Sequence, residues 1–251
     1  MFDIQENEML KKRFTELADR AKTQWRTVYS DFLNLEQQNI LNSIYYSTDV
    51  NLFGGYEGAE RKIACFGDDD TEAIKSELPI SCIEISPVAP KFADKLTHRD
   101  FLGALMSLGI KRETLGDIIV YENKGYVFCL DKMSEYIISN VNSIKHTTVK
   151  CKEVLSPPDE CVSLPDEKSI TVASSRIDVL IACIYKLSRS AVNPLFVQGK
   201  VFVSGRQITN SSYNLNEGDI VSVRGFGRFI FCQISGKTKK DRLKVGVRIF
   251  K

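Results

Sequence analysis

The sequence predicts an α+β fold in which helical and β-rich stretches form consecutive small domains. Two observations support this class. Apolar residues switch between helical and strand periodicity several times along the 251 residues, and the proline-rich acidic segment 155–169 shows no periodicity. We interpret that segment as a linker between an acidic N-terminal part and a basic C-terminal third. The chain is long enough for two to three small domains, and its 43% apolar content can supply their cores.

Residues 1–76 are expected to form two helices followed by a β-hairpin. Apolar residues at helical spacing include Phe14 and Leu17 in the first stretch and Leu41 and Ile44 in the second. The strings "DVNLF" and "RKIACF" then flank the loop "GGYEGAE", whose glycines suit turn positions. The N-terminal region is therefore helical with a hairpin at its end.

Residues 77–154 show an ordered series of six elements. The strings "ISCIEI", "DIIVYENKGYVFCL" and "TTVKCKEV" supply four strands, two of them around a short turn. The strings "THRDFLGALMSLG" and "DKMSEYIISNVNSI" supply two amphipathic helices, the first with Thr97 and Asp100 as a capping box. The order βαββαβ predicts a ferredoxin-like sheet with two helices on one face, the layout that RNA-recognition motifs share.

The string "KGYVFCL" places two aromatic residues on the third strand of that sheet. Tyr126 and Phe128 are two residues apart, so they share a face. If the face is open, both rings can stack on bases, with Lys150 on the last strand near the phosphates. The alternative is that another part of the protein covers both rings.

Residues 170–251 are expected to form a helix, a second helix, a hairpin and a strand. The first helix carries apolar residues from Ile177 to Leu187, with Ser174 or Ser175 as N-cap. The second begins in "LSRSAV", and the hairpin "KVFVSGRQI" turns near Ser204 and its following glycine. Because Pro194 lies in the second helix, we expect that helix to start late or to be short.

Charge is distributed unevenly along the chain. Residues 169–251 contain 14 Lys and Arg against 4 Asp and Glu, a net charge of +10, which leaves −8 for residues 1–168. A basic C-terminal third predicts a polyanionic partner, nucleic acid before membrane, because no basic amphipathic helix accompanies it. The seven cysteines show no zinc-ligand spacing and the N-terminus no signal-peptide pattern. We therefore expect a cytoplasmic monomer with free thiols, without a membrane segment, metal or cofactor.

Spaced motifs in the last third resemble the S-four RNA-binding domain, named from the fourth protein of the small ribosomal subunit. The match over residues 174–231 consists of R-I-D-V-L, L-S-R-S, G-K-V-x-V-x-G and G-D-I-V-x-V in that order. Together with "LFGGYEGAERK", "HRDFLGALMSLGIKRETLGDI" and "SVRGFGRF", this pattern is similar to the bacterial YlmH family over essentially the whole chain. The resemblance implies a ribosome-associated RNA-binding protein that contacts ribosomal RNA and tRNA. It implies a role in quality control on large subunits that still hold peptidyl-tRNA.

The resemblance and the charges together nominate two sets of RNA-binding residues. If the residues of the first set converge, they form one phosphate-binding surface. The first set is Arg176, Ser188, Arg189, Ser190, Lys200, Ser204, Arg206, Arg224 and Arg228. The second set, of possible secondary contacts, is Arg61, Lys62, Arg99, Lys111, Arg112, Tyr126, Phe128 and Lys150.

The main alternative is an RNA-modifying enzyme with an S-four targeting domain. Asp178 in "SRID" is similar to the aspartate of the R-L-D motif in pseudouridine synthases, although a cap formed with Ser175 explains it more simply. The histidines, His98 and His146, have no nucleophile or carboxylate at catalytic spacing. We therefore expect no catalytic residue. A third hypothesis, a division or scaffold protein without RNA, is disfavoured by the basic C-terminal third.

Overall fold

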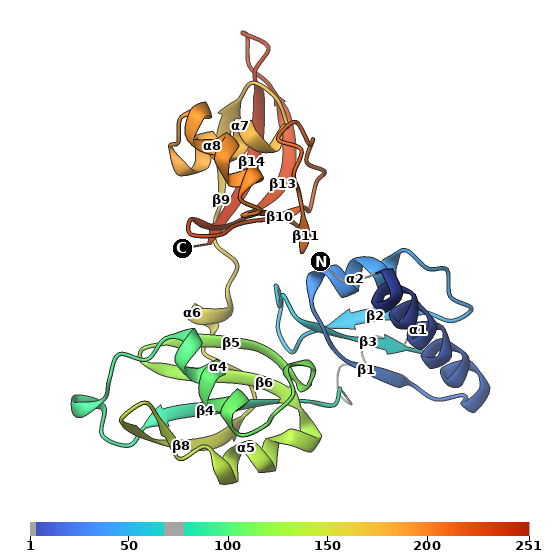
Figure 1. Cartoon of the computed structure of the whole chain (residues 1–251), viewed down its shortest axis with the longest axis vertical. Coiled ribbons are helices and arrows are strands. Elements are labelled where there is room, and N and C mark those ends of the chain that lie inside the picture. The colour runs from blue at the N-terminus through green and yellow to red at the C-terminus, as the bar shows by residue number, and fades with distance from the viewer. Residues whose placement is uncertain (1–3, 68–77, 251) are drawn as a thin grey trace. The chain divides into compact units, whose positions relative to one another are not determined.

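The computed structural model describes residues 4–67 and 78–250 (Figure 1). The chain divides into two compact units, a body unit of residues 2–163 and a C-terminal unit of residues 164–251. The N-terminal region and the ferredoxin-like region, which the sequence suggests as separate domains, thus belong to one unit.

The N-terminal region of the body unit packs two helices against a three-stranded antiparallel sheet of order β1-β3-β2. Its core includes Phe14, Ala18 and Phe66. The two helices and the hairpin are confirmed, but the strand between the helices is missing from the sequence-based prediction. The elements are α1 (Ile4–Gln24), β1 (Val28–Leu33), α2 (Leu35–Asn42), β2 (Val50–Phe53) and β3 (Lys62–Phe66).

The second region of the body unit has the predicted βαββαβ order, with one extra short strand at the edge. Its antiparallel sheet has the order β5-β6-β4-β8-β7. Helices α4 and α5 cover one face, where Phe101 and Ile137 pack against Ile83 and Val127 (Figure 1). The strands are β4 (Ile80–Pro87), β5 (Leu115–Tyr121), β6 (Lys124–Leu130), β7 (Ser143–Ile144) and β8 (Thr147–Val154). The helices are η1 (Pro90–Phe92), α4 (His98–Ser107), η2 (Arg112–Thr114), η3 (Asp131–Met133) and α5 (Ser134–Asn140).

The opposite face of this sheet is covered by the N-terminal region. Tyr126 is 3% exposed and Phe128 is 2% exposed, and both belong to a cluster with Phe32 and Ile63. The ring of Tyr56 stacks on Phe128 with centroids 5.1 Å apart. The hypothesis of base stacking on an open face is therefore wrong, because this face is part of the core of the body unit.

The predicted linker 155–169 contains ordered elements on both sides of the boundary between the two units, which lies between Ser163 and Leu164. The short helix α6 (Asp159–Val162) precedes the boundary, and strand β9 (Glu167–Val172) follows it. Most of β9 is exposed and polar because it forms an edge of the C-terminal sheet. The polarity of an edge strand thus explains why the sequence there resembles a linker.

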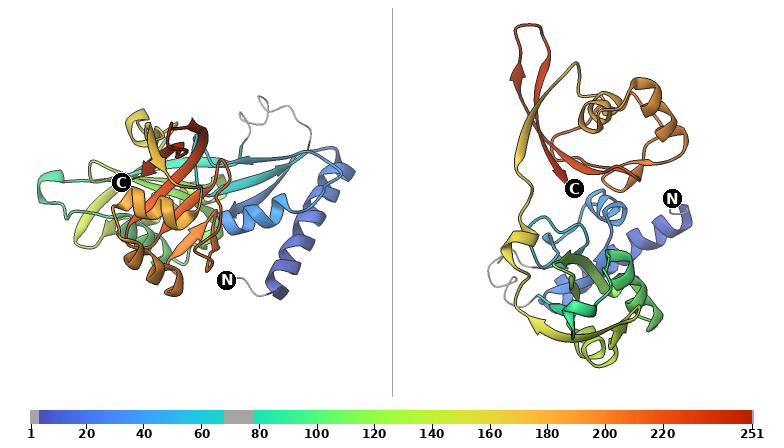
Figure 2. Two further views of the ribbon diagram at one scale, coloured as in Figure 1. Left: turned by 90° about the horizontal axis from the view of Figure 1, so that it is seen from above. Right: turned by 90° about the vertical axis from the view of Figure 1, so that its left-hand side faces the viewer.

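The C-terminal unit packs two helices against one face of a six-stranded antiparallel sheet (Figures 1 and 2). The sheet order is β11-β10-β12-β13-β14-β9, and Figure 2 shows the β13–β14 hairpin, in red, extending past the other strands. The helix, helix, hairpin and strand expected from the sequence are present in that order. The elements after β9 are α7 (Ile177–Tyr185), α8 (Arg189–Val197), β10 (Val201–Val203), β11 (Arg206–Gln207), β12 (Ile220–Val223), β13 (Gly227–Lys237) and β14 (Leu243–Phe250).

Of the two alternatives for the second helix, the late start is wrong, whereas the helix is short, with nine residues. Helix α8 begins at Arg189 and includes Pro194 in its interior. Proline removes the N–H that would bond to the carbonyl of Ser190. Both residues are exposed, so water can reach that carbonyl and the helix continues.

Candidate nucleic-acid interface

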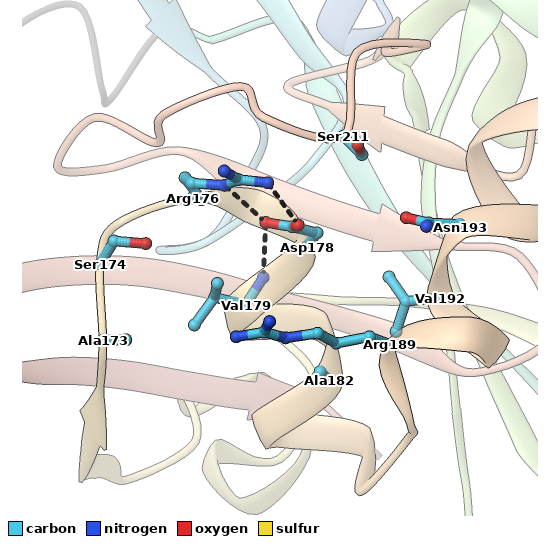
Figure 3. A pocket seen from close by; sticks show the side chains of 10 residues that line it. All are labelled: Ala173, Ser174, Arg176, Asp178, Val179, Ala182, Arg189, Val192, Asn193 and Ser211. Atoms are coloured by element: carbon cyan, nitrogen blue, oxygen red, sulfur yellow. Dashed lines mark hydrogen bonds and ion pairs between the residues drawn. The ribbon is translucent and has the colours of Figure 1, made fainter.

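A cavity of about 430 Å³ opens between the starts of α7 and α8 in the C-terminal unit (Figure 3). It brings together Arg176 and Arg189, two of the residues nominated from the sequence. Its polar lining therefore combines guanidinium, carboxylate, amide and hydroxyl groups. The cavity is lined by Ala173, Ser174, Arg176, Asp178, Val179, Ala182, Arg189, Val192, Asn193 and Ser211.

Arg176 forms the N-cap of α7, where the sequence suggested Ser174 or Ser175. Backbone bonds hold this helix start, since Ile177 N donates to Tyr213 O at 2.8 Å and Leu215 N donates to Ser175 O at 3.0 Å. The helix start is thus fixed by pairing with the loop before β12 rather than by a serine side chain.

The side chain of Arg176 is paired with Asp178 in a two-point contact. Arg176 Nε donates to Oδ1 at 3.1 Å, and Nη2 donates to Oδ2 at 2.7 Å (Figure 3). The carboxylate raises the pKa of Arg176, and it also accepts a bond from Val179 N at 2.9 Å. Asp178 thus pairs with Arg176 and Val179 instead of forming the expected cap with Ser175. The pair keeps the guanidinium at the cavity edge.

Helix α8 has Ser188 as its N-cap, and the side chain of the next residue, Arg189, is available to bind a ligand. Ser188 Oγ accepts a bond from Ala191 N at 3.2 Å and lies 2.8 Å from Ser190 Oγ. Arg189 is exposed, and within residues 4–67 and 78–250 no hydrogen bond or ion pair engages its side chain. A cation at a helix N-terminus opposes the helix dipole. An incoming phosphate would satisfy both the guanidinium and the backbone N–H groups there.

A second group of basic residues consists of Lys200 before β10, Arg224 after β12 and Arg228 in β13, and these three strands are neighbours in the sheet. Arg224 N donates to Lys200 O at 2.9 Å, so these two residues are neighbours. The guanidinium of Arg224 lies 4.6 Å from the ring centre of Phe202, and that of Arg228 lies 4.1 Å from Phe250. Both arginines thus sit on aromatic rings, an arrangement that holds a planar cation in place.

The nominated residues of the C-terminal unit do not all converge on one surface. Phe229 and Phe231 are buried against the helices, so Arg228, which alternates with them along β13, points to the other face of the sheet. Arg176 and Arg189 lie on the helix side. The expected single surface is therefore wrong for Arg228.

The turn between β10 and β11 uses left-handed backbone at both central residues. Ser204 has φ 46° and Gly205 has φ 81°, as a type I′ turn requires. Ser204 N donates to Ile220 O at 2.7 Å, and Ile220 N donates to Ser204 Oγ at 3.4 Å. Arg206 follows the turn on the edge strand and is exposed. The predicted hairpin is confirmed, and it presents Arg206 to solvent.

Two arginines nominated in the body unit are structural. Arg61 Nε donates to Leu115 O at 2.9 Å, and its Nη2 donates to Phe32 O at 3.0 Å. Arg112 Nη1 donates to Leu115 O at 2.8 Å and to Gly116 O at 3.1 Å. Burial and the nearby Arg112 lower the pKa of Arg61 to about 10. Both side chains bind backbone carbonyls inside the unit, which gives them a structural role, and their contact with RNA stays a prediction.

The other nominated body residues differ in exposure. Arg99, Lys111 and Lys150 are exposed and Lys62 is half-buried. Their contact with RNA stays a prediction.

Several polar and basic residues were absent from the nominated sets. Asn193 and Ser211 line the cavity. The β13–β14 hairpin ends in a basic tip, which the charge run "KTKKDRLK" could have revealed. The basic residues of this part are Lys237, Lys239, Lys240, Arg242 and Lys244.

Within residues 4–67 and 78–250, no group of three or more His, Cys, Asp or Glu side chains is arranged to hold a metal ion. In the same ranges no helix is long and apolar enough to span a bilayer. The cysteines are free thiols, and Cys65, Cys82 and Cys129 are buried. Burial raises the pKa of Cys82 and Cys129 to about 12, so these thiols are packing residues.

The chain matches known proteins over most of its length. The family description "YlmH, N-terminal" matches residues 6–71, and "Putative RNA-binding domain in YlmH" matches residues 75–156. The ribosome-associated protein quality control protein P2 of Bacillus subtilis (strain 168) is 32% identical over 234 residues, covering 90% of this chain and 88% of that protein. A solved structure named cell division protein ylmH from Streptococcus pneumoniae covers 65% of this chain and 98% of its own, with TM-score 0.52 and 23% identity, a likeness in fold. The chain therefore belongs to the YlmH family.

Proposed function

We propose that this protein is an RNA-binding factor that associates with the ribosome and contacts RNA mainly through its C-terminal unit, an S-four domain. The observation that carries the proposal is the cavity between α7 and α8, where Arg189 is unpaired in the described chain and Arg176 lies at the edge. Two helix starts and two guanidinium groups at one cavity favour phosphate. The net charge of +10 on residues 169–251 adds long-range attraction to a polyanion.

The family relationship supports the ribosome as the place where this protein binds RNA. The Bacillus subtilis relative is named a ribosome-associated quality control protein, and residues 75–156 match a domain described as RNA-binding. We infer that the chain binds ribosomal RNA and tRNA on large subunits obstructed by peptidyl-tRNA. In this role the protein is a cytoplasmic monomer that binds without catalysing a reaction.

The alternative is an RNA-modifying enzyme that uses Asp178 as its catalytic carboxylate. Such a carboxylate would need to reach the target base. Both oxygens of Asp178 are instead engaged by Arg176, and one also accepts the Val179 N–H. This pairing supports binding over catalysis at the cavity.

Sedimentation of cell lysate on sucrose gradients tests the proposal. The full-length protein is expected in large-subunit fractions at low salt and to leave them as salt rises, since phosphate contacts release counterions. Its absence from ribosomal fractions at low and moderate salt would contradict the proposal.

A comparison of modified nucleosides separates the two functions. Ribosomal RNA and tRNA from cells with and without the protein are digested and analysed by mass spectrometry. A binding factor leaves the modification pattern unchanged. A modification that disappears with the protein and returns with the wild-type chain but not with Asp178→Asn would favour the enzyme.

A further inference from the structure

Helix α1 ends at a residue with an unusual backbone conformation. Trp25 has φ 49°, and Arg26 N donates to Ala21 O at 3.3 Å across the helix end. This bond is typical of the Schellman motif, whose left-handed position is usually a glycine. A bulky aromatic residue there is unfavourable for the backbone, so local helix termination does not explain the choice of tryptophan.

The side chain of Trp25 gains nothing from packing. It is 93% exposed, and it is the only tryptophan in the chain. Trp is highly buried on average in folded proteins. Burial therefore does not account for a tryptophan at this position, whereas a ligand for the indole ring would.

Trp25 lies at the edge of a second cavity, of about 330 Å³. This volume is within the range of about 300–1,000 Å³ that is usual for ligand sites. Three hydroxyl groups and two cations share the lining with the indole. The cavity is lined by Ala21, Lys22, Trp25, Arg26, Thr27, Ser47, Thr48 and Gly67.

The charges around this cavity favour an anionic ligand. Lys22 and Arg26 line it, and among the residues that the structure describes no carboxylate does. In the described part of the chain, neither cation has a side-chain hydrogen bond or ion pair. Cations also stabilise a helix C-terminus, which accounts for Lys22 but not for the aromatic ring beside it. An exposed ring flanked by cations and hydroxyls matches the way proteins bind unpaired nucleotides.

We propose that the Trp25 cavity binds an unpaired nucleotide of RNA, with the base stacked on the indole and the phosphate held by Lys22 and Arg26. This site belongs to the body unit. Its residues differ from those of the cavity in the C-terminal unit that Arg176 and Arg189 line, the arginine cavity. It rests on the proposed function only in taking RNA as the ligand. The hydroxyls of Thr27, Ser47 and Thr48 can bond to the base edge or the ribose.

Fluorescence of the full chain tests the site directly, because Trp25 is the only indole. The probe is a single-stranded hexaribonucleotide, and the control is a blunt duplex of the same length. Stacking is expected to quench the emission with the single strand and not with the duplex.

Variants separate stacking from a structural role. Anisotropy of a labelled hexamer should show binding weakened roughly 5- to 150-fold by Trp25→Gly, the range expected for loss of one base–aromatic stack. Trp25→Phe keeps a ring and should retain part of the affinity. Glycine suits the left-handed position, so Trp25→Gly should melt at or above the temperature of the parent. Arg26→Ala should weaken binding, while Lys12→Ala, exposed elsewhere on α1, should not.

The experiment also distinguishes this site from the C-terminal one. Quenching should persist in the Arg189→Ala variant. Quenching that disappears with Arg189→Ala, or equal hexamer affinity for Trp25→Gly and the parent, would overturn the site and leave the proposed function intact. A Trp25→Gly protein that leaves ribosomal particles although the hexamer never quenches the parent would also overturn it, in favour of a protein ligand. If Arg189→Ala loses ribosome association and Trp25→Gly does not, the result bears on the proposed function and not on the Trp25 site.

Discussion

The ring of Tyr56 stacks on that of Phe128, with centroids 5.1 Å apart and planes inclined by 27°. This contact joins the glycine loop of the N-terminal region to the ferredoxin-like sheet and makes Phe128 a core residue. Gly55 lies against the same ring, and a Cβ atom there would come within 2.5 Å of Phe128 Cδ1. We therefore expect the two regions to unfold together.

Replacement of the buried ring should affect stability rather than RNA binding. Phe128→Ala is expected to lower the free energy of unfolding by about 3–5 kcal/mol, as for other buried Phe→Ala changes. Urea denaturation followed by circular dichroism measures the loss, and Phe128→Leu provides a milder variant. RNA affinity per folded molecule should not change. A folded, fully stable variant with lost RNA affinity would restore the base-stacking role.

Removal of the Arg189 guanidinium should weaken RNA binding at the arginine cavity. Arg189→Ala is expected to reduce the slope of log affinity against log salt by about 0.7–0.9, the value for one lost phosphate contact. Titrations of labelled ribosomal RNA at several salt concentrations provide the slope. Lys91→Ala, which removes an exposed charge from the body unit, is the matched control. An unchanged slope for Arg189→Ala means that this side chain does not bind phosphate.

Neutralisation of the Asp178 carboxylate at the arginine cavity should strengthen RNA binding, the opposite of the effect expected for Arg189→Ala. Asp178→Asn removes a negative charge beside the expected phosphate and releases Arg176 from its two-point contact. RNA affinity at low salt should therefore rise, and its salt dependence should become steeper. The same titrations measure both effects. Weaker binding would show that the carboxylate is needed to place Arg176.

The half-buried Arg61 of the body unit should contribute to stability. Arg61→Ala leaves the carbonyls of Phe32 and Leu115 without one of their donors. The free energy of unfolding is expected to fall by about 1–3 kcal/mol, measured by urea denaturation. Lys111→Ala, at an exposed position, should change it by at most about 0.5 kcal/mol. Equal effects of the two changes would contradict the structural assignment of Arg61.

The capping box of α4 predicts a loss of stability in acid. Lys145 Nζ lies 2.7 Å from Asp100 Oδ2, and Thr97 donates to the same oxygen from N and Oγ1 at 2.8 and 2.7 Å. These contacts, first Lys145 and then Thr97, lower the pKa of Asp100 to about 2. The depressed pKa stabilises the folded state above the pKa of the unfolded chain, and this contribution disappears as pH falls through about 2. Thermal melts between pH 5 and 2 should fall less steeply for Asp100→Asn than for the parent, and parallel curves would refute the linkage.

The order of elements was predictable because it depends on local periodicity. Strand β1 is one of the exceptions, because Ser30 occupies one of its inward positions. Its hydroxyl is buried, and two hydrogen bonds compensate for the loss of water, because it accepts a bond from Ala64 N at 2.8 Å and donates to Asp31 O at 2.7 Å. A polar residue at an inward position hides the alternation, and the partner that satisfies it is on a distant strand.

The arginine cavity was partly predictable for the same reason. Arg176 and Arg189 precede or start helices, which their local sequences reveal. The structural role of Arg61 depends instead on the carbonyls of Leu115, 54 residues later, and of Phe32, 29 residues earlier. Asp117 holds the loop before Arg61 by accepting bonds from Glu60 N and Tyr56 Oη at 2.7 and 2.8 Å. Such contacts between remote segments leave no periodic pattern in the sequence.

The pairing of the first and last strands of the C-terminal unit determines when this unit can form. In the ladder, Val172 of β9 lies opposite Leu243 and Glu167 lies opposite Arg248 of β14. Because β14 also separates β9 from β13, a nascent chain that lacks its last residues cannot complete the sheet against which α7 and α8 pack. The body unit can fold while synthesis continues. We therefore expect the cavity lined by Arg176 and Arg189 to assemble only after β14 is available to pair with β9 and β13.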